Sequence, residues 1–169
     1  MESRHRKQIR LPNYDYSQNG FYFVTICTEH RKHILAEIYP VGADDSVRPY
    51  GTFEYKLTPV GEMVENCIHQ IEERQSTIFV HKYVVMPNHI HMVIAIDDMA
   101  GGQSRPPLQK IVQGFKSVTT RKCWDYGRTT LWQRSYYDHI IRSEAEYLQI
   151  WQYIDENPAH WAEDEYYTR

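Results

Sequence analysis

The sequence predicts an α+β protein with a ferredoxin-like (split βαβ) antiparallel sheet, two helices on one face of that sheet and an added C-terminal helix. Two observations predict this class. Segments with strand-like and helix-like patterns follow one another in the order strand, helix, strand, strand, helix, strand, helix. The 169 residues are enough for one sizeable core, and they contain no internal repeat. We therefore expect a single domain over residues 1–169.

The N-terminal third contains one clear strand. Residues 20–28, GFYFVTICT, are rich in aromatic and β-branched side chains and are apolar on both faces, which is typical of a central strand. Residues 1–19 are polar and include the run RHRK, so we expect a basic N-terminal arm. Residues 37–56 mix Gly, Pro and Asp with short apolar pieces, which indicates an inserted loop or irregular hairpin.

A helix is predicted after this insertion. Thr58 is the expected N-cap and Pro59 the first helical residue. Apolar residues then recur at three- and four-residue spacing and form one buried face: Val60, Met63, Val64, Cys67, Ile68 and Ile71. Two strands follow, residues 77–87 and 89–96, and the Pro-Asn turn between them predicts an antiparallel pair.

The second half of the chain predicts two helices separated by a strand. Residues 108–123 have an apolar face and an opposite polar face, and residues 129–142 indicate a short strand plus a turn. The last helix begins with a capping box at Ser143 and has an apolar stripe made of Tyr147, Ile150, Trp151 and Ile154. An Asn-Pro pair ends this helix, and residues 162–169 form an acidic tail that we interpret as a solvated end.

Composition argues against membrane and secreted classes. No apolar run approaches the roughly 20 residues that a transmembrane helix needs. The first residues lack the apolar centre of a secretory signal, so we expect a soluble, cytoplasmic protein. Cys27, Cys67 and Cys123 are odd in number and far apart in the sequence, which predicts reduced, buried thiols.

The net charge of −3 hides a segregation of charge along the chain. Residues 105–142 hold eight Lys or Arg and two acids, whereas residues 143–169 hold seven acids and one Arg. A basic block is typical of phosphate binding, and the 14 tyrosines supply rings that can stack on unpaired bases. Scattered surface charge is the competing interpretation. The candidate nucleic-acid-binding residues are Lys110, Lys116, Arg121, Arg134 and Arg142.

Two histidines interrupt an otherwise apolar strand. Side chains alternate along a strand, so His89 and His91 point to one face while Ile90 and Met92 point to the core. The two imidazoles are close enough to ligate one metal ion, although a pair of hydrogen-bonded polar residues explains the pattern equally well. A metal site would also need a third protein ligand and open positions for a substrate.

The last helix offers candidates for the rest of such a site. Tyr153 lies at the border of the apolar stripe, and Asn157 lies one turn later on the same side. Spacing alone favours an ordinary interpretation, in which Tyr153 is a border aromatic and Asn157 a C-cap before proline. The functional interpretation places both residues in a cleft with the histidine pair, where the helix docks beside the sheet.

Three segments resemble one family. The segments MPNHIHMVI, WQRSYYDHIIR and YIDENPAHW are similar to those of the single-tyrosine HUH transposases, in particular the REP-associated tyrosine transposases of the IS200-like superfamily. The likeness extends over nearly the whole chain, and it implies the same ferredoxin-like sheet. It also implies that His89 and His91 are metal ligands, that Tyr153 is the nucleophile and that Asn157 is the third ligand.

The resemblance further implies an activity. Members of this family cleave and rejoin single-stranded, often hairpin-forming DNA through a 5′-phosphotyrosine intermediate, so it implies Mg²⁺ or Mn²⁺ as cofactor and DNA as partner. Monomer and homodimer both stay open, because in some relatives the tyrosine helix of one chain meets the histidine pair of its partner. The overall acidity of this chain departs from the pattern expected of such an enzyme.

Two other functions remain as alternatives. The first is a non-catalytic, RRM-like module that binds single-stranded nucleic acid on an open sheet face. The central strand here carries histidines where such a module carries exposed aromatic residues. The second is a metal-dependent hydrolase that uses the histidine pair and a water molecule, without a covalent intermediate.

Overall fold

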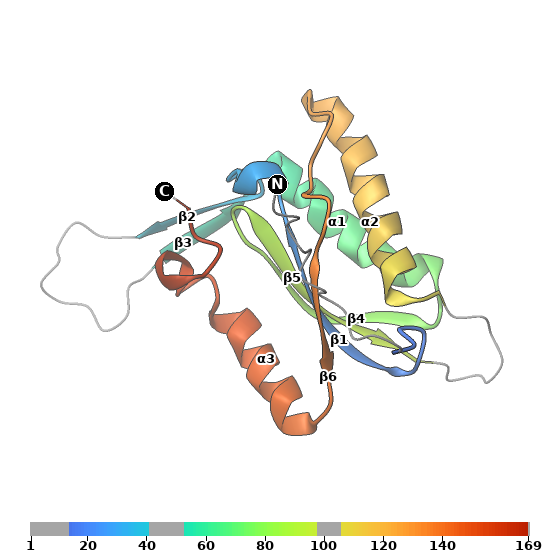
Figure 1. Cartoon of the computed structure of the whole chain (residues 1–169). Coiled ribbons are helices and arrows are strands. Elements are labelled where there is room, and N and C mark those ends of the chain that lie inside the picture. Colours follow the sequence, from blue (N-terminus) through green and yellow to red (C-terminus); the bar gives the residue numbers. More distant parts are fainter. Residues whose placement is uncertain (1–13, 41–52, 98–105, 169) are drawn as a thin grey trace, which may run out of the picture.

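The computed structural model describes residues 14–40, 53–97 and 106–168 (Figure 1). Most of the expected N-terminal arm, the middle of the 37–56 insertion and Arg105 therefore lie outside the described residues. The described elements are β1 (Gly20–Cys27), η1 (Glu29–Arg31), β2 (Ala36–Pro40), β3 (Phe53–Leu57), α1 (Pro59–Arg74), β4 (Ile78–Val85), β5 (His89–Ile96), α2 (Leu108–Lys122), η2 (Cys123–Tyr126), β6 (Tyr137–Ile141), α3 (Glu144–Glu156) and η3 (Trp161–Glu163).

The main sheet has the strand order β4-β5-β1-β6, and all neighbouring strands are antiparallel. It is built from two interleaved split βαβ units. In the first unit β1 and β4 flank β5 and are joined through α1, and in the second β5 and β6 flank β1 and are joined through α2. The predicted ferredoxin-like fold is thus confirmed, and so is the central position of β1.

Two helices cover one face of the sheet and form the main core. Figure 1 shows α1 and α2 together on that side. The predicted start of α1 is confirmed, since the Thr58 hydroxyl accepts a hydrogen bond from the Gly61 N–H at 3.1 Å. The core beneath these helices includes Val64, Ile68, Leu108, Phe115, Ile90 and Met92.

The three cysteines are free and buried, as predicted. No helix in the described parts of the chain is long and apolar enough to cross a bilayer.

The opposite face of the sheet is partly covered by α3. Ile154 of α3 packs in a second apolar cluster with Val93 of β5 and with Trp161. The last helix was expected to dock beside the sheet, but it packs on this face, and every residue of β5 is buried. The reason is that α3 begins close after the edge strand β6, so its apolar stripe can be buried only by folding back across the sheet.

The start of β5 is held by the turn that precedes it. The Met86 N–H donates to the His89 carbonyl at 2.8 Å and closes the β4–β5 turn. The Pro87 carbonyl in that turn accepts from the N–H groups of Ile34 and Leu35 at 2.9 and 3.0 Å. These bonds fix the backbone where the first histidine leaves the turn.

Separately, β2 and β3 pair as a two-stranded antiparallel sheet made from the ends of the 37–56 insertion.

Candidate metal and tyrosine site

His89 and His91 lie on the face of β5 opposite the main core, as strand alternation predicts. The Nε2 atoms of the two rings are 3.0 Å apart. Both side chains are almost completely buried, with 0% and 1% of their surface exposed. Two ring nitrogens held this close inside a protein must share a proton or face one cation, because two lone pairs repel each other.

Hydrogen bonds to the other ring nitrogens fix the orientation of this pair. The Asn88 Nδ2 donates to the Tyr166 carbonyl at 2.8 Å, which turns the Asn88 Oδ1 toward the His89 Nδ1, also at 2.8 Å. An amide oxygen only accepts, so His89 carries its proton on Nδ1 and presents a lone pair at Nε2. The Thr25 hydroxyl lies 2.8 Å from the His91 Nδ1 and can accept its proton in the same way. Such partners are typical of metal-ligating histidines.

Burial keeps both imidazoles uncharged. It lowers the pKa of His89 to about 3, and the nearby Arg31 guanidinium adds to this effect. The pKa of His91 is lowered well below its ordinary value by burial and by His89, although the charge of Asp164 acts in the opposite direction. Both rings are therefore neutral at pH 7, which is the form that binds metal ions.

The first turn of α3 is tied to the end of β6. The Ser143 hydroxyl accepts from the Glu146 N–H at 3.2 Å, which is one of the two hydrogen bonds of the predicted capping box. The Glu146 carboxylate accepts from the Arg142 N–H at 2.7 Å and lies 2.6 Å from the His139 Nε2. These contacts set the direction in which α3 crosses the sheet, and this direction brings Tyr153 over β5.

Tyr153 reaches the histidine pair from α3. Its Oη lies 3.3 Å from the His91 Nε2, and its ring stands edge-on to His91 and Phe23 at 5.2 and 6.1 Å between ring centres. The side chain is 40% exposed, in keeping with its predicted border position. Burial of the hydroxyl end raises the pKa of Tyr153 to about 12, and the charges of Asp164 and Glu165 add to the rise. The phenol is therefore neutral at pH 7.

Asn157 follows the last residue of α3 and is buried beside this cluster. Its Nδ2 donates to the Asp164 Oδ2 at 2.9 Å. Its Oδ1 is buried and has no hydrogen-bond partner among the described residues. A buried amide oxygen without a partner destabilises the fold by about 1–3 kcal/mol, and a ligand bound to this oxygen would offset that cost.

Sequence reasoning missed Asp164. The ligand atoms of His89, His91 and Asp164 lie within 4.8 Å of one another and form a group that could hold a metal ion. The Asp164 carboxylate is also 3.5 Å from the Tyr153 Oη. Interpreting residues 162–169 as a solvated end was therefore wrong for Asp164. The role of Asn157 as a metal ligand stays a prediction.

The C-terminal segment covers the histidine pair. The Tyr166 ring lies 4.7 Å from the His89 ring and 5.8 Å from the His91 ring, measured between ring centres. The Arg31 guanidinium lies over the Tyr166 ring at 5.2 Å. A cleft of about 620 Å³ stays open beside Tyr153, and it is lined by Phe23, His91, Tyr137, Tyr153, Asn157, His160, Glu163, Asp164, Glu165 and Tyr166.

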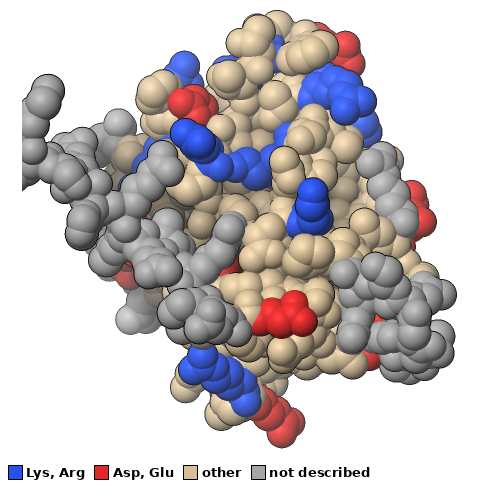
Figure 2. Space-filling model, turned by 45° about the vertical axis from the view of Figure 1, so that its right-hand side comes forward, with Lys and Arg blue, Asp and Glu red and all other residues tan. Residues whose placement is uncertain are grey.

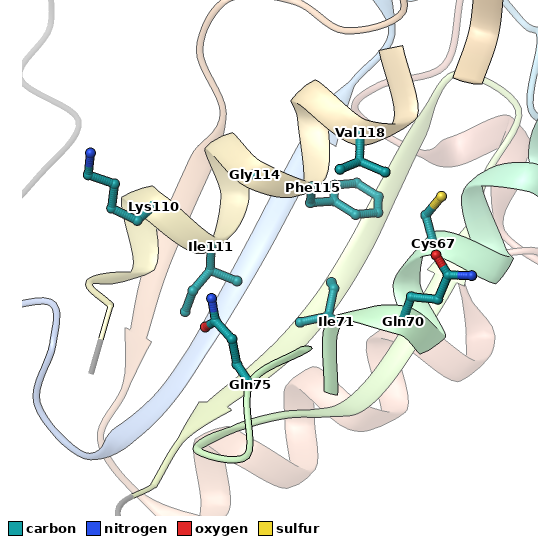
Figure 3. A pocket seen from close by; sticks show the side chains of 9 residues that line it. All are labelled: Cys67, Gln70, Ile71, Gln75, Lys110, Ile111, Gly114, Phe115 and Val118. Carbon is teal, nitrogen blue, oxygen red and sulfur yellow. The ribbon is translucent and has the colours of Figure 1, made fainter. Parts of the chain in front are cut away.

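The five predicted nucleic-acid-binding residues do not form one surface. Lys116, Arg121 and Arg134 line a single groove on α2. Lys110 lies at a smaller hollow between α1 and α2, and Figure 3 shows its amine directed away from the apolar side chains there. Arg142 lies in another hollow at the start of α3. These five candidates thus lie at three different hollows, and their binding to nucleic acid stays a prediction.

Comparison with known proteins decides the family. The sequence model of the family described as transposase IS200 like (Y1_Tnp) matches residues 54–157, more than half of the chain. The chain belongs to the IS200-like transposase family. The matched range of this IS200-like chain includes both histidines of β5, Tyr153 and Asn157, so the family resemblance of these segments is confirmed.

Two similar proteins place the family match in context. An uncharacterized protein of Haemophilus influenzae is 32% identical, over 97% of this IS200-like chain and 94% of that protein. The solved structure of a REP-associated tyrosine transposase bound to a REP hairpin matches with a TM-score of 0.62 and 19% identity, over 90% of this chain and 73% of that chain. At this level of identity the match shows that the two chains share a fold.

Proposed function

We propose that this chain cleaves and rejoins single-stranded DNA through a covalent tyrosine intermediate, with a divalent metal ion in the site. The observation that carries the proposal is the position of the Tyr153 Oη, 3.3 Å from the His91 Nε2 and beside an open cleft. The hydroxyl is thus close to the place where an ion held by the histidine pair would bind a phosphate, and such proximity of nucleophile and reacting group favours phosphoryl transfer.

The reaction is a transfer of one phosphate ester to another. The Tyr153 oxygen attacks a phosphorus of the DNA backbone and loses its proton. The bond from phosphorus to the 3′ oxygen breaks, and that oxygen leaves as a hydroxyl group. The products are a 5′-phosphotyrosine and a free 3′ end, so the energy of the broken ester is retained and no ATP is needed. Attack by a 3′ hydroxyl on the phosphotyrosine reverses these steps and rejoins the strand.

The donor set in the site fits Mg²⁺ or Mn²⁺. Two neutral imidazoles present their Nε2 atoms to one place, Asp164 adds a carboxylate, and Asn157 has a buried carbonyl oxygen without a partner. Mixed nitrogen and oxygen donors suit Mn²⁺ at least as well as Mg²⁺, which prefers oxygen. A divalent ion held there would polarise the phosphate and offset the negative charge that Asp164 places beside the phenol.

The residues of the chain hold the phenol in its neutral form until substrate arrives. The Tyr153 Oη can donate to the Asp164 Oδ2 at 3.5 Å or, as long as no ion uses the lone pair of the His91 Nε2, to that nitrogen at 3.3 Å. Burial and the negative charge of Asp164 both keep the proton on oxygen. Compensating this charge is therefore the condition for forming the phenolate. The edge-on contact with Phe23 keeps the ring in place while this occurs.

A covalent-adduct assay tests the proposal. The protein is incubated with single-stranded DNA, with and without a hairpin, in the presence of Mn²⁺, and a denaturing gel detects protein bound to DNA. Hairpins are included because the solved structure with the same fold holds one. We expect an adduct that disappears in Tyr153→Phe, in the double variant His89→Ala, His91→Ala, and in EDTA.

Tyr137→Phe is the matched control, since Tyr137 lines the same cleft and is 46% exposed. It should form the adduct. An adduct that survives in Tyr153→Phe excludes Tyr153 as the nucleophile. DNA cut by Tyr153→Phe without any adduct would instead favour the metal-dependent hydrolase, and DNA bound but never cut by the parent protein would favour the RRM-like module.

A further inference from the structure

A second hollow of the molecule, the α2 groove, has the composition of a nucleic-acid surface. It measures about 620 Å³ and is lined by Gln109, Val112, Gln113, Lys116, Ser117, Thr120, Arg121, Trp124, Arg134 and Tyr136. Its lining contains three cationic side chains and no carboxylate. Figure 2 faces the side of the molecule on which α2 lies, and Lys and Arg side chains are spread over the upper half of that view.

Trp124 is the most unusual side chain of the α2 groove. It belongs to η2 and is 62% exposed, the largest exposed fraction among the large hydrophobic side chains of the described residues. Exposing an indole ring to water costs free energy unless a partner covers it. The flat ring lies in the same groove as the guanidinium groups of Arg121 and Arg134, and this combination suits bases that stack and phosphates that carry charge.

The α2 groove is rigidly built. Lys116 donates hydrogen bonds from its Nζ to the carbonyl oxygens of Gln133 and Arg134 at 2.6 and 3.0 Å. The Trp132 Nε1 donates to the buried Thr119 hydroxyl at 2.7 Å. Both contacts hold residues 132–134, which precede β6, against α2. This segment and α2 form the two walls of the groove. The groove therefore exists before any ligand binds, which reduces the entropy lost on binding.

The α2 groove and the Tyr153 cleft meet at one edge of the sheet. Tyr136 lines the groove, and its neighbour Tyr137, the first residue of β6, lines the cleft. Consecutive residues of an extended segment point to opposite faces, and β6 is an edge strand. A single DNA strand can thus pass around the edge of β6 from one hollow to the other without crossing the sheet.

The geometry points to one occupant: unpaired nucleotides of the same DNA strand that enters the Tyr153 cleft. The α2 groove would hold this single-stranded flank and so select substrates that carry one. This inference rests on the proposed function for the identity of the DNA, but the binding it describes is separate from the chemistry at Tyr153. A stacked indole discriminates poorly between bases, so the groove would bind an unpaired flank whatever its base sequence.

Binding measurements on three variants test the inference. Fluorescence anisotropy is recorded for a hairpin with a dT flank and for the same hairpin without a flank, with Tyr153→Phe as the background protein to prevent cleavage. In this background Trp124→Ala should weaken binding of the flanked hairpin about tenfold and leave the blunt hairpin unchanged. Trp124→Phe should retain most of the affinity. Tyr126→Ala is the matched control, because Tyr126 lies on the same η2 turn, is 43% exposed and does not line the groove.

Salt dependence provides a second readout. The double variant Arg121→Gln, Arg134→Gln should reduce the slope of log affinity against log salt by about 1.4, since each phosphate contact with a single strand contributes about 0.7. The inference is overturned if Trp124→Ala binds the flanked hairpin like the background protein, if both hairpins lose affinity equally, or if Tyr126→Ala has the same effect. If Trp124→Ala loses affinity for the flanked hairpin but the parent protein forms no adduct with any DNA, the proposed chemistry is excluded and the inference about the α2 groove is supported.

Discussion

The Oη of Tyr153 lies 3.3 Å from the Nε2 of His91 in the same chain. One chain therefore supplies the proposed nucleophile, both histidines and Asp164. The sequence left open whether the tyrosine of one chain acts on the histidines of another, and this distance favours a site within a single chain.

Mixing two inactive variants should not restore activity. Tyr153→Phe lacks the proposed nucleophile, and His91→Ala lacks a proposed metal ligand, so an equimolar mixture regains adduct formation only if the site is shared between two chains. We expect less than about one tenth of the parent activity, measured as adduct per protein on a denaturing gel. Recovery of a quarter or more of the parent activity would show a homodimer with exchanged helices.

Replacing Asp164 should weaken metal binding more than replacing Asn157. Asp164→Asn removes the only negative charge among the three clustered ligand groups, and the affinity for Mn²⁺ should fall on the order of 100-fold. Asn157→Ala should cost about tenfold, through the buried Oδ1 and the bond to Asp164. Isothermal titration calorimetry with Mn²⁺ measures both. Glu163→Gln is the control for loss of a neighbouring charge, and equal affinities in Asp164→Asn and Glu163→Gln would rule out Asp164 as a ligand.

Removing the Tyr166 ring should expose the histidine pair. This ring lies 4.7 Å from the His89 ring, so Tyr166→Ala should raise the rate at which an imidazole-specific acylating reagent modifies His89 and His91 by severalfold. Mass spectrometry of the digested protein measures this rate. Tyr167→Ala serves for comparison, because Tyr167 contacts Trp161 at 5.2 Å. Similar rates in both variants would mean that the segment as a whole, not this ring, protects the pair.

Glu146 should contribute stability that depends on pH. Hydrogen bonds from the Arg142 N–H and from His139 lower the pKa of the Glu146 carboxyl. A lowered folded-state pKa means that the stabilisation is present above the unfolded pKa of about 4.3 and is lost as pH falls through the folded value. Because this carboxylate is partly exposed, we expect Glu146→Gln to cost about 0.5–1 kcal/mol at pH 7.

Urea unfolding at neutral pH and at about pH 3 measures this contribution. The difference between Glu146→Gln and the parent protein should shrink toward zero at the lower pH. Glu144→Gln, in the same first turn of α3, reports the general effect of a charge near the helix start. A difference that stays constant across both pH values would contradict the linkage.

Local periodicity predicted where most of the candidate residues lie, whereas their roles came only from the family resemblance. Strand alternation placed His89 and His91 on one face, and the helical period placed Tyr153 and Asn157 on one side of α3. These rules work because they depend only on backbone geometry. They could not say on which face of the sheet α3 docks, so the cover over β5 was missed.

Asp164 could not be located in this way, because it follows a proline and a short η3 turn that have no regular period. The same limit explains the basic residues. A run of charge in the sequence does not show where each side chain points, and the five candidate residues line three different hollows. Trp124 was not among the predicted binding residues, because the sequence does not show whether a single tryptophan side chain is buried or exposed.

The amide of Asn88 connects two parts of the protein that the sequence keeps far apart. Its nitrogen holds the Tyr166 carbonyl and its oxygen holds the His89 ring, so the amide can face only one way while the C-terminal segment stays docked. Undocking that segment frees the amide to rotate by half a turn and to offer His89 a donor instead of an acceptor. The proton of His89 would then move to Nε2 and occupy the position needed by an ion. We therefore expect the proposed ability of His89 to bind an ion to be coupled to the docking of Tyr166.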